Sequence, residues 1–255
     1  MIPLFGGVAR KKRDGVGNGL VGLIWVYFGV MFQMTTSQID KLGKRLTKEP
    51  ILDVDLNLLD QYRLSFSDAY EYVVSKLHDA KFNVTGRQTK STQSIISKRH
   101  REKTSLSTMQ DIAGCRVVVP DILSQNLAIS HLEILFSNSI VKKQDRRVIP
   151  SHGYRAVHLV VSYNGRVIEI QVRTALQHLW AEMCEKLSDV FGIEVKYGGG
   201  PQDVCDCLVR SATLFSQAEN VEAPNPDFQI IDARNRKLIK EVWLSIGGDD
   251  NAFSN

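Results

Sequence analysis

Hydrophobic and polar residues alternate over two short stretches on either side of Asn164-Gly165. Strict alternation predicts β-strands, and Asn-Gly between them predicts a type I′ hairpin, because both central positions of that turn need positive φ. With a two-residue turn, His158 lies opposite Gln171, and one face of the hairpin is apolar throughout. The opposite face carries polar side chains, namely Tyr154, His158, Glu169, Gln171 and Arg173.

Longer stretches have hydrophobic residues three and four positions apart, which predicts amphipathic helices. The expected elements are helices over 55–77, 94–101, 124–136, 174–188, 203–218 and 235–246, and an apolar strand over 115–119 that Pro120 ends. Because helices and strands are interleaved, we expect an α+β fold in which a mixed β-sheet is flanked by helices.

The first 33 residues differ from the rest of the chain. Basic residues 10–13 precede an apolar run over 19–32, which is the layout of a signal peptide or a short membrane anchor. Because this run is short for a membrane span, we expect 1–33 to be a leader or the product of a misassigned start. We then expect a main domain over 34–196 and a helical extension over 197–255 that packs on the same domain.

Composition adds a location and a local charge. The chain is 43% hydrophobic and 24% charged, as globular proteins are, and its four irregularly spaced cysteines do not form a disulfide framework. We expect a cytoplasmic protein and no metal at the lone Cys205-x-Cys207 pair. The stretch 87–103 holds six cationic side chains against Glu102 alone. Such a cluster suits polyphosphate or an RNA backbone, although it also occurs on solvated helix faces.

Four motifs in the middle of the chain resemble, in order and spacing, the synthetase domain of the RelA/SpoT family. They are the stretch with Gly86-Arg87, Lys90, Ser94 and Lys98, then DIAGCR over 111–116, GYRAVH over 153–158 and EIQVRT over 169–174. One such motif alone would be weak, whereas four together are specific. The resemblance covers about residues 56–196 and implies a nucleotidyltransferase-like fold.

The resemblance implies transfer of the β,γ-pyrophosphate of ATP to the ribose 3′-hydroxyl of GDP or GTP, which makes the alarmone (p)ppGpp. Such a reaction needs a divalent cation, cationic groups on the phosphate oxygens and a carboxylate near the attacking hydroxyl. By resemblance, Asp111 and Glu169 are the catalytic residues and hold Mg²⁺.

The resemblance also implies two sets of nucleotide-binding residues. The ATP-binding residues are Arg87, Lys90, Ser94, Lys98 and Arg116. Within this set Arg87 and Arg116 sandwich the adenine, since a planar guanidinium stacks better than an ammonium group. The acceptor-binding residues are Tyr154, His158, Gln171 and Arg173, with Tyr154 stacked on the acceptor base.

The sequence departs from the family pattern in two places. Arg87 and Lys90 are three positions apart instead of two. The stretch 145–152 is shorter than in the family and lacks the lysine that helps to bind the acceptor's phosphates, for which Arg146 and Arg147 are the candidate replacements.

Two other functions stay open. Some toxin-type relatives place pyrophosphate on the 3′ end of tRNA, and an inactive copy of the fold could be a nucleotide- or RNA-binding regulator. The presence of both Asp111 and Glu169 disfavours the regulator. A homo-oligomer is compatible with the outer helices, and stable membrane association is expected only if 19–32 is a real anchor.

Overall fold

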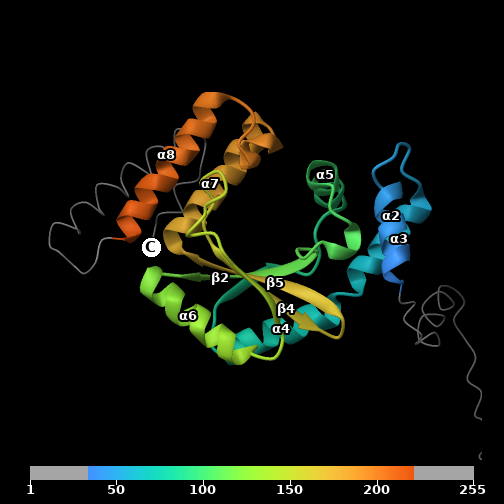
Figure 1. Ribbon diagram of the computed structural model, residues 1–255, viewed down its shortest axis with the longest axis horizontal. Coiled ribbons are helices and arrows are strands. Elements are labelled where there is room, and N and C mark those ends of the chain that lie inside the picture. The colour runs from blue at the N-terminus through green and yellow to red at the C-terminus, as the bar shows by residue number, and fades with distance from the viewer. Residues whose placement is uncertain (1–33, 221–255) are drawn as a thin grey trace, which may run out of the picture. The chain divides into compact units, whose positions relative to one another are not determined.

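The computed structural model describes residues 34–220, and a mixed five-stranded β-sheet forms its centre. The strands are β1 (Val84–Arg87), β2 (Ala113–Val119), β3 (Ile140–Asp145), β4 (Val157–Tyr163) and β5 (Arg166–Thr174). They lie in the order β1-β2-β5-β4-β3, with β2 and β5 parallel and the other neighbouring pairs antiparallel. Helices flank this sheet, which confirms the predicted fold class (Figure 1).

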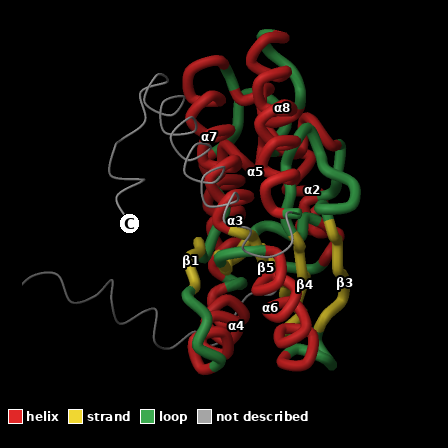
Figure 2. The backbone as a smooth tube through the Cα atoms, turned by 90° about the vertical axis from the view of Figure 1, so that its left-hand side faces the viewer, coloured by secondary structure: helices red, strands yellow, loops and turns green. Residues whose placement is uncertain are grey.

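Helices cover both faces of the sheet. The helices are α2 (Thr36–Arg45), α3 (Asp53–Leu64), α4 (Ser67–Asp79), α5 (Thr92–Glu102), α6 (Ile122–Leu135), α7 (Ala175–Phe191) and α8 (Gln202–Glu219), with short 3₁₀ turns η1 (Leu106–Thr108) and η2 (Ile193–Tyr197). Figures 1 and 2 show α4 and α6 on one side of the sheet and α5, α7 and α8 on the other. None of the described helices is both long and apolar enough to cross a membrane.

The β4–β5 hairpin has the predicted register. His158 lies opposite Gln171, and Tyr163 opposite Arg166, with Asn164 and Gly165 both at positive φ in the turn. The apolar face of the hairpin is fully buried under α4 and α6. Its residues are Val157, Leu159, Val161, Ile168, Ile170 and Val172, all 0% exposed. The polar face is therefore left on the side of α5 and α7.

The long helix expected over 55–77 is wrong, because the structure has two helices there, α3 and α4. α3 ends at Leu64, and Ser65 is its C-terminal cap. The Ser65 hydroxyl donates to the carbonyl oxygen of Tyr62, and the Ser65 backbone N–H donates to the carbonyl oxygen of Gln61. The turn buries Phe66 against the ring of Tyr62. Hydrophobic spacing alone does not reveal the break, because apolar residues continue at helical intervals on both sides of it.

Three further elements, α2, β1 and β3, were not predicted from the sequence. Of these, β3 lies at an edge of the sheet and exposes Lys142 and Lys143, so it has neither the apolar run of a central strand nor strict alternation. The other elements expected within 34–220 form where the pattern placed them, to within a few residues. The leader over 1–33 and the helix over 235–246 lie outside the described residues, and the division into domains stays a prediction.

The chain passes directly from β5 into α7. Thr174, the last residue of β5, caps α7 by accepting the backbone N–H of Gln177, whose side chain accepts the backbone N–H of Thr174 in return. α7 and α8 then pack through a buried apolar cluster around Trp180, Leu187 and Phe215. All four cysteines are free, and only Cys207 is exposed.

Candidate active site

Two rows of residues cross the polar face of the sheet from strand to strand. One row aligns Arg87 of β1, Gly114 of β2 and Glu169 of β5. The next row aligns Arg116 of β2, Gln171 of β5 and His158 of β4. Because residues in register on neighbouring strands point to the same side, side chains from three separate motifs share one surface.

Glu169 lies in a ring of hydrogen-bonded side chains. One carboxylate oxygen accepts from Nδ1 of His158 at 2.7 Å, and the other accepts from the Gln171 amide at 2.8 Å. The guanidinium of Arg173 donates to the Gln171 carbonyl oxygen at 2.8 Å. It also donates to the hydroxyl of Tyr154 at 3.0 Å, and that hydroxyl lies 3.0 Å from Nε2 of His158. The ring brings together the whole acceptor-binding set that the resemblance implies.

Two members of this ring, Arg173 and Glu169, can form hydrogen bonds in one direction only. Arg173 can only donate, and an ionised Glu169 can only accept. Nδ1 of His158 therefore carries the proton that faces Glu169, because an ionised carboxylate has none to donate. The carboxylate is thus held in one orientation, with lone pairs left over for a cation or a substrate hydroxyl.

Asp111, in the turn before β2, binds two lysines. Its oxygens lie 2.6 Å from Nζ of Lys90 and 3.0 Å from Nζ of Lys98. Burial alone would raise the pKa of Asp111, but the two ammonium groups outweigh it and lower that pKa to about 2. Burial in turn lowers the pKa of Lys90, against the pull of Asp111. Lys90 and Lys98 thus lie beside the carboxylate of Asp111, whereas the resemblance implies that they bind the ATP phosphates.

The two carboxylates act on each other. Burial would raise the pKa of Glu169, but hydrogen bonds from His158 and Gln171 hold it below its usual value, while the charge of Asp111 opposes them. Both groups are therefore anionic at neutral pH. The described residues contain no group of three His, Cys, Asp or Glu side chains placed to hold a metal. Mg²⁺ does not need one, since it binds through one or two carboxylates together with water and substrate phosphates.

The remaining ATP-set residues surround this pair. Ser94 lies in the first turn of α5, where its backbone N–H donates to the capping hydroxyl of Ser91. Arg87 is exposed, whereas Arg116 is half-buried and its Nε has no hydrogen-bond partner among the described residues. Burial and the nearby Arg173 lower the pKa of Arg116. A half-buried guanidinium that lacks a hydrogen-bond partner at Nε is a candidate for binding a ligand.

Tyr154 is held on several sides. The Arg173 guanidinium lies 5.1 Å from its ring centroid, and the Trp180 ring lies 6.4 Å away. Burial raises the pKa of Tyr154, so its hydroxyl stays protonated. The backbone at Gly153 lies close to Trp180, because a Cβ there would lie 2.7 Å from the indole.

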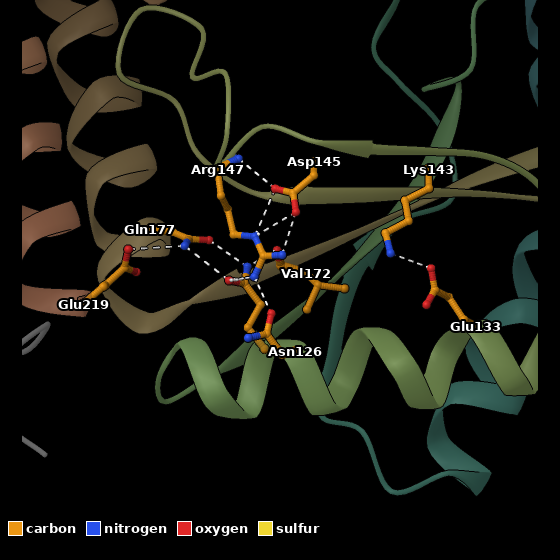
Figure 3. A network of polar contacts seen from close by, with 9 residues as sticks. Asn126, Glu133, Lys143, Asp145, Arg147, Val172, Gln177 and Glu219 are labelled. Atoms are coloured by element: carbon orange, nitrogen blue, oxygen red, sulfur yellow. Dashed lines mark hydrogen bonds and ion pairs between the residues drawn. The ribbon is translucent and has the colours of Figure 1, made fainter. Parts of the chain in front are cut away.

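Of the two arginines proposed to replace the missing lysine, Arg147 is engaged elsewhere. Figure 3 shows its guanidinium bonded to both oxygens of Asp145 and to Asn126 of α6, on the side of the sheet away from Glu169. The backbone N–H of Arg146 donates to Ala156 and continues the β3–β4 ladder. Alternation therefore directs Arg146 to the face that carries His158.

Sequence reasoning missed two features of the site. His178 of α7 has a buried Nδ1 without a partner among the described residues, and burial together with Arg116 lowers its pKa although Glu182 opposes this. Its signal was its place one turn after the polar strand β5, in the helix expected over 174–188. The second feature is the Arg101 guanidinium, which lies 3.5 Å from the Tyr197 ring centroid and joins α5 to η2. No local pattern links two residues so far apart in sequence.

Comparisons with known proteins agree with this architecture. A sequence model of the region found in RelA/SpoT proteins matches residues 87–196. An uncharacterized protein of Mycobacterium tuberculosis is 36% identical over 129 residues, which are 49% of this chain and 46% of that protein. A probable chloroplastic GTP diphosphokinase of Arabidopsis thaliana is 34% identical over 103 residues, covering 40% of this chain and 14% of that protein. The chain therefore matches less than half the length of these curated relatives.

Among solved structures, small alarmone synthetase 1 of Bacillus subtilis, bound to its product pppGpp, has a TM-score of 0.54 and 22% identity. The match covers 71% of this chain and 99% of that one. The fold is thus that of the small alarmone synthetases. The sequence match shows that residues 87–196 are similar to the region found in RelA/SpoT proteins.

Proposed function

We propose that this chain is an ATP-dependent pyrophosphokinase that acts on GDP or GTP and makes (p)ppGpp. The observation that carries the proposal is the meeting of Asp111 and Glu169 on one side of the sheet, close enough for the charge of Asp111 to raise the pKa of Glu169. Two anionic carboxylates surrounded by lysine and arginine side chains suit polyphosphate chemistry at a divalent cation.

The donor side is supported by the β1–β2 register. Arg87 and Arg116 are diagonal neighbours on the same face. Diagonal residues of an antiparallel pair are about 7–8 Å apart, which leaves room for a planar ring between them, since each stacked contact takes roughly 3.5–4 Å. The first turn of α5 with Ser94, next to Lys90 and Lys98, then receives the phosphates, because helix N-termini bind anions.

The two lysines have a second role in this proposal. In this structure both lysines form ion pairs with Asp111. With ATP and Mg²⁺ in place, Asp111 would be a ligand of the metal and the two lysines would donate to phosphate oxygens. The bound Mg²⁺ supplies charge neutralisation at the transferring phosphates. The ion pairs therefore hold Lys90, Lys98 and Asp111 close to the positions in which they would bind phosphate oxygens and the metal ion.

The chemical step uses Glu169. The 3′-hydroxyl oxygen of the acceptor attacks the β-phosphorus of ATP, and the bond from that phosphorus to the α–β bridging oxygen breaks, so that AMP leaves with the electron pair. The hydroxyl proton moves to the Glu169 carboxylate, which His158 and Gln171 hold in place. On the acceptor side, Tyr154 is the candidate for stacking on the base, and Arg146 is the candidate for the acceptor's phosphates.

The test is a transfer assay with purified protein, Mg²⁺ and γ-labelled ATP, in which GDP, GTP, ATP and deacylated tRNA are offered separately. We expect label on GDP or GTP. Label on tRNA would replace this proposal with the toxin-type reaction. ATP binding without transfer to any acceptor would indicate a regulator.

Glu169→Gln tests the carboxylate. The amide can still accept hydrogen bonds but cannot take the hydroxyl proton, so kcat should fall by about 10²–10⁴-fold while ATP affinity changes little. Steady-state kinetics and calorimetric ATP titration measure the two quantities. The control is Glu133→Gln. Glu133 is a half-exposed residue of α6 that pairs with Lys143 of β3, so its replacement should leave kcat unchanged. Retained transfer in Glu169→Gln would remove this carboxylate from the mechanism.

A further inference from the structure

The stretch that carries Tyr154 rests on the two C-terminal helices of the described chain. We call residues 151–156 the Tyr154 segment. At Gly153, φ is +92° and an added Cβ would lie 2.7 Å from the Trp180 ring of α7 and 3.0 Å from Ala212 of α8. The Trp180 indole N–H donates to the carbonyl oxygen of Leu208, also in α8, at 2.9 Å. The middle of the segment therefore fits between α7 and α8 with no space to spare.

A buried ion pair fixes the same segment one residue after Tyr154. The Arg155 guanidinium donates to the carboxylate of Glu219 in the last turn of α8, and the two side chains are only 9% and 2% exposed. The carboxylate also accepts from the Thr174 hydroxyl and from the Gln177 amide, at the start of α7. Glu219 is thus the point where α8, the end of β5 and the Tyr154 segment meet.

The network continues to the other end of the β3–β4 connection. Gln177 and Gln125 exchange hydrogen bonds between α7 and α6, and Gln125 accepts from Arg147 at 3.2 Å (Figure 3). Both ends of the connection that presents Tyr154 are therefore tied to one set of buried polar groups. By contrast, among the described residues the hydrogen bonds of this network do not extend to Lys90, Lys98 or Asp111.

We infer that Glu219 is a positioning residue for acceptor binding, which it controls by holding Arg155 and thereby the ring of Tyr154. This inference rests on the proposed function, in which Tyr154 contacts the acceptor. Loss of the Glu219 charge leaves the Arg155 guanidinium buried without an anion, which drives the segment toward water. Tyr154 then moves relative to His158 and Arg173, while the ATP side keeps its geometry. Glu219 lies outside residues 87–196, so the family match does not include it.

The test compares wild type with Glu219→Gln in the transfer assay, with each substrate varied in turn. We expect the acceptor KM to rise on the order of tenfold, since misplacement by about 1 Å can cost up to 100-fold. The ATP KM should stay within about twofold of wild type, because the network does not extend to the ATP side of the site. A general loss of folding would instead affect both substrates alike. Hydrogen exchange across residues 151–156 should become faster in the variant, a readout that needs no activity.

Two further variants separate positioning from a loss of stability. Leu187→Ala removes part of the same α7–α8 cluster without touching Arg155, so it should lower Tm and leave the acceptor KM unchanged. Glu219→Gln combined with Arg155→Met removes the unpaired charge and should recover much of the acceptor KM. An unchanged acceptor KM in Glu219→Gln, or an equal rise in both KM values, would overturn the inference. If wild type transfers pyrophosphate to no acceptor, the proposed function itself fails.

Discussion

At the scale of single residues, the site holds its two carboxylates by different means. Asp111 is anionic because two ammonium groups lie beside it, whereas Glu169 is anionic because His158 and Gln171 donate hydrogen bonds to both of its oxygens. In the proposed mechanism, the partners of Asp111 can be exchanged for phosphate and a metal ion, while those of Glu169 hold a base in one orientation. The difference in partners would then separate a cation-binding role from a proton-accepting role.

The ion pairs of Asp111 give a pH-dependent stability with a defined sign. The pKa of Asp111 falls from 3.8 to about 2 on folding, so its contribution is present above about pH 4 and is lost as pH falls toward 2. That contribution is about 2 kcal/mol. Lys90→Met should raise the pKa of Asp111, since burial is then opposed by Lys98 alone.

Carboxyl-detected NMR titration of wild type and Lys90→Met measures this pKa directly. Lys143→Met is the matched control, because Lys143 pairs with Glu133 on the far side of the sheet. It should leave the Asp111 titration where it is. An unchanged titration curve of Asp111 in Lys90→Met would show that Lys90 does not lower the pKa of Asp111.

At the scale of elements, the hairpin and the helices that leave it place the chemistry. The Asn164-Gly165 turn sets a register in which every second residue of β5 faces the site. Thr174 then starts α7 at once, which carries Trp180 back over the Tyr154 segment. Periodicity predicted this hairpin and most helices. It failed at the α3–α4 break and at β3, where a local turn and an exposed edge leave no distinct pattern.

Two glycines allow the packing of the Tyr154 segment to be measured. Gly153 and Gly165 both have positive φ, but an added Cβ meets Trp180 at the first and nothing within 4 Å at the second. Gly165→Ala should cost only the backbone strain, about 1–2 kcal/mol. Gly153→Ala adds overpacking worth another 1–3 kcal/mol or so. Urea unfolding of both variants gives the difference, and equal losses would mean that the segment is not tightly seated.

At the scale of the whole described chain, the fold and the chemistry are separable. Much of the core consists of apolar side chains between the sheet and the helices α4 and α6, and a second apolar cluster lies between α7 and α8. The charged side chains of the candidate site lie on the face of the sheet that α4 and α6 leave open. The site combines residues that the family match includes with support from α8, which it does not.

Chelation of divalent metal should therefore abolish transfer and leave Tm unchanged. The described residues hold no group of three His, Cys, Asp or Glu side chains that would couple folding to a metal. Activity and thermal unfolding are measured in EDTA and in EDTA saturated beforehand with Mg²⁺. A fall in Tm only with free EDTA would indicate a structural metal and contradict this view.

The sequence by itself determined the local elements and which residues line the polar face of the hairpin. Alternation and turn chemistry act over a few residues, so they predicted the hairpin and its polar face with Glu169, while the family resemblance pointed to Asp111 as the second carboxylate. Only the tertiary structure decided which charges meet. The ion pairs of Asp111, the orphaned Nδ1 of His178 and the hold of Glu219 on Arg155 all join residues from separate elements, and such contacts depend on packing that no local pattern encodes.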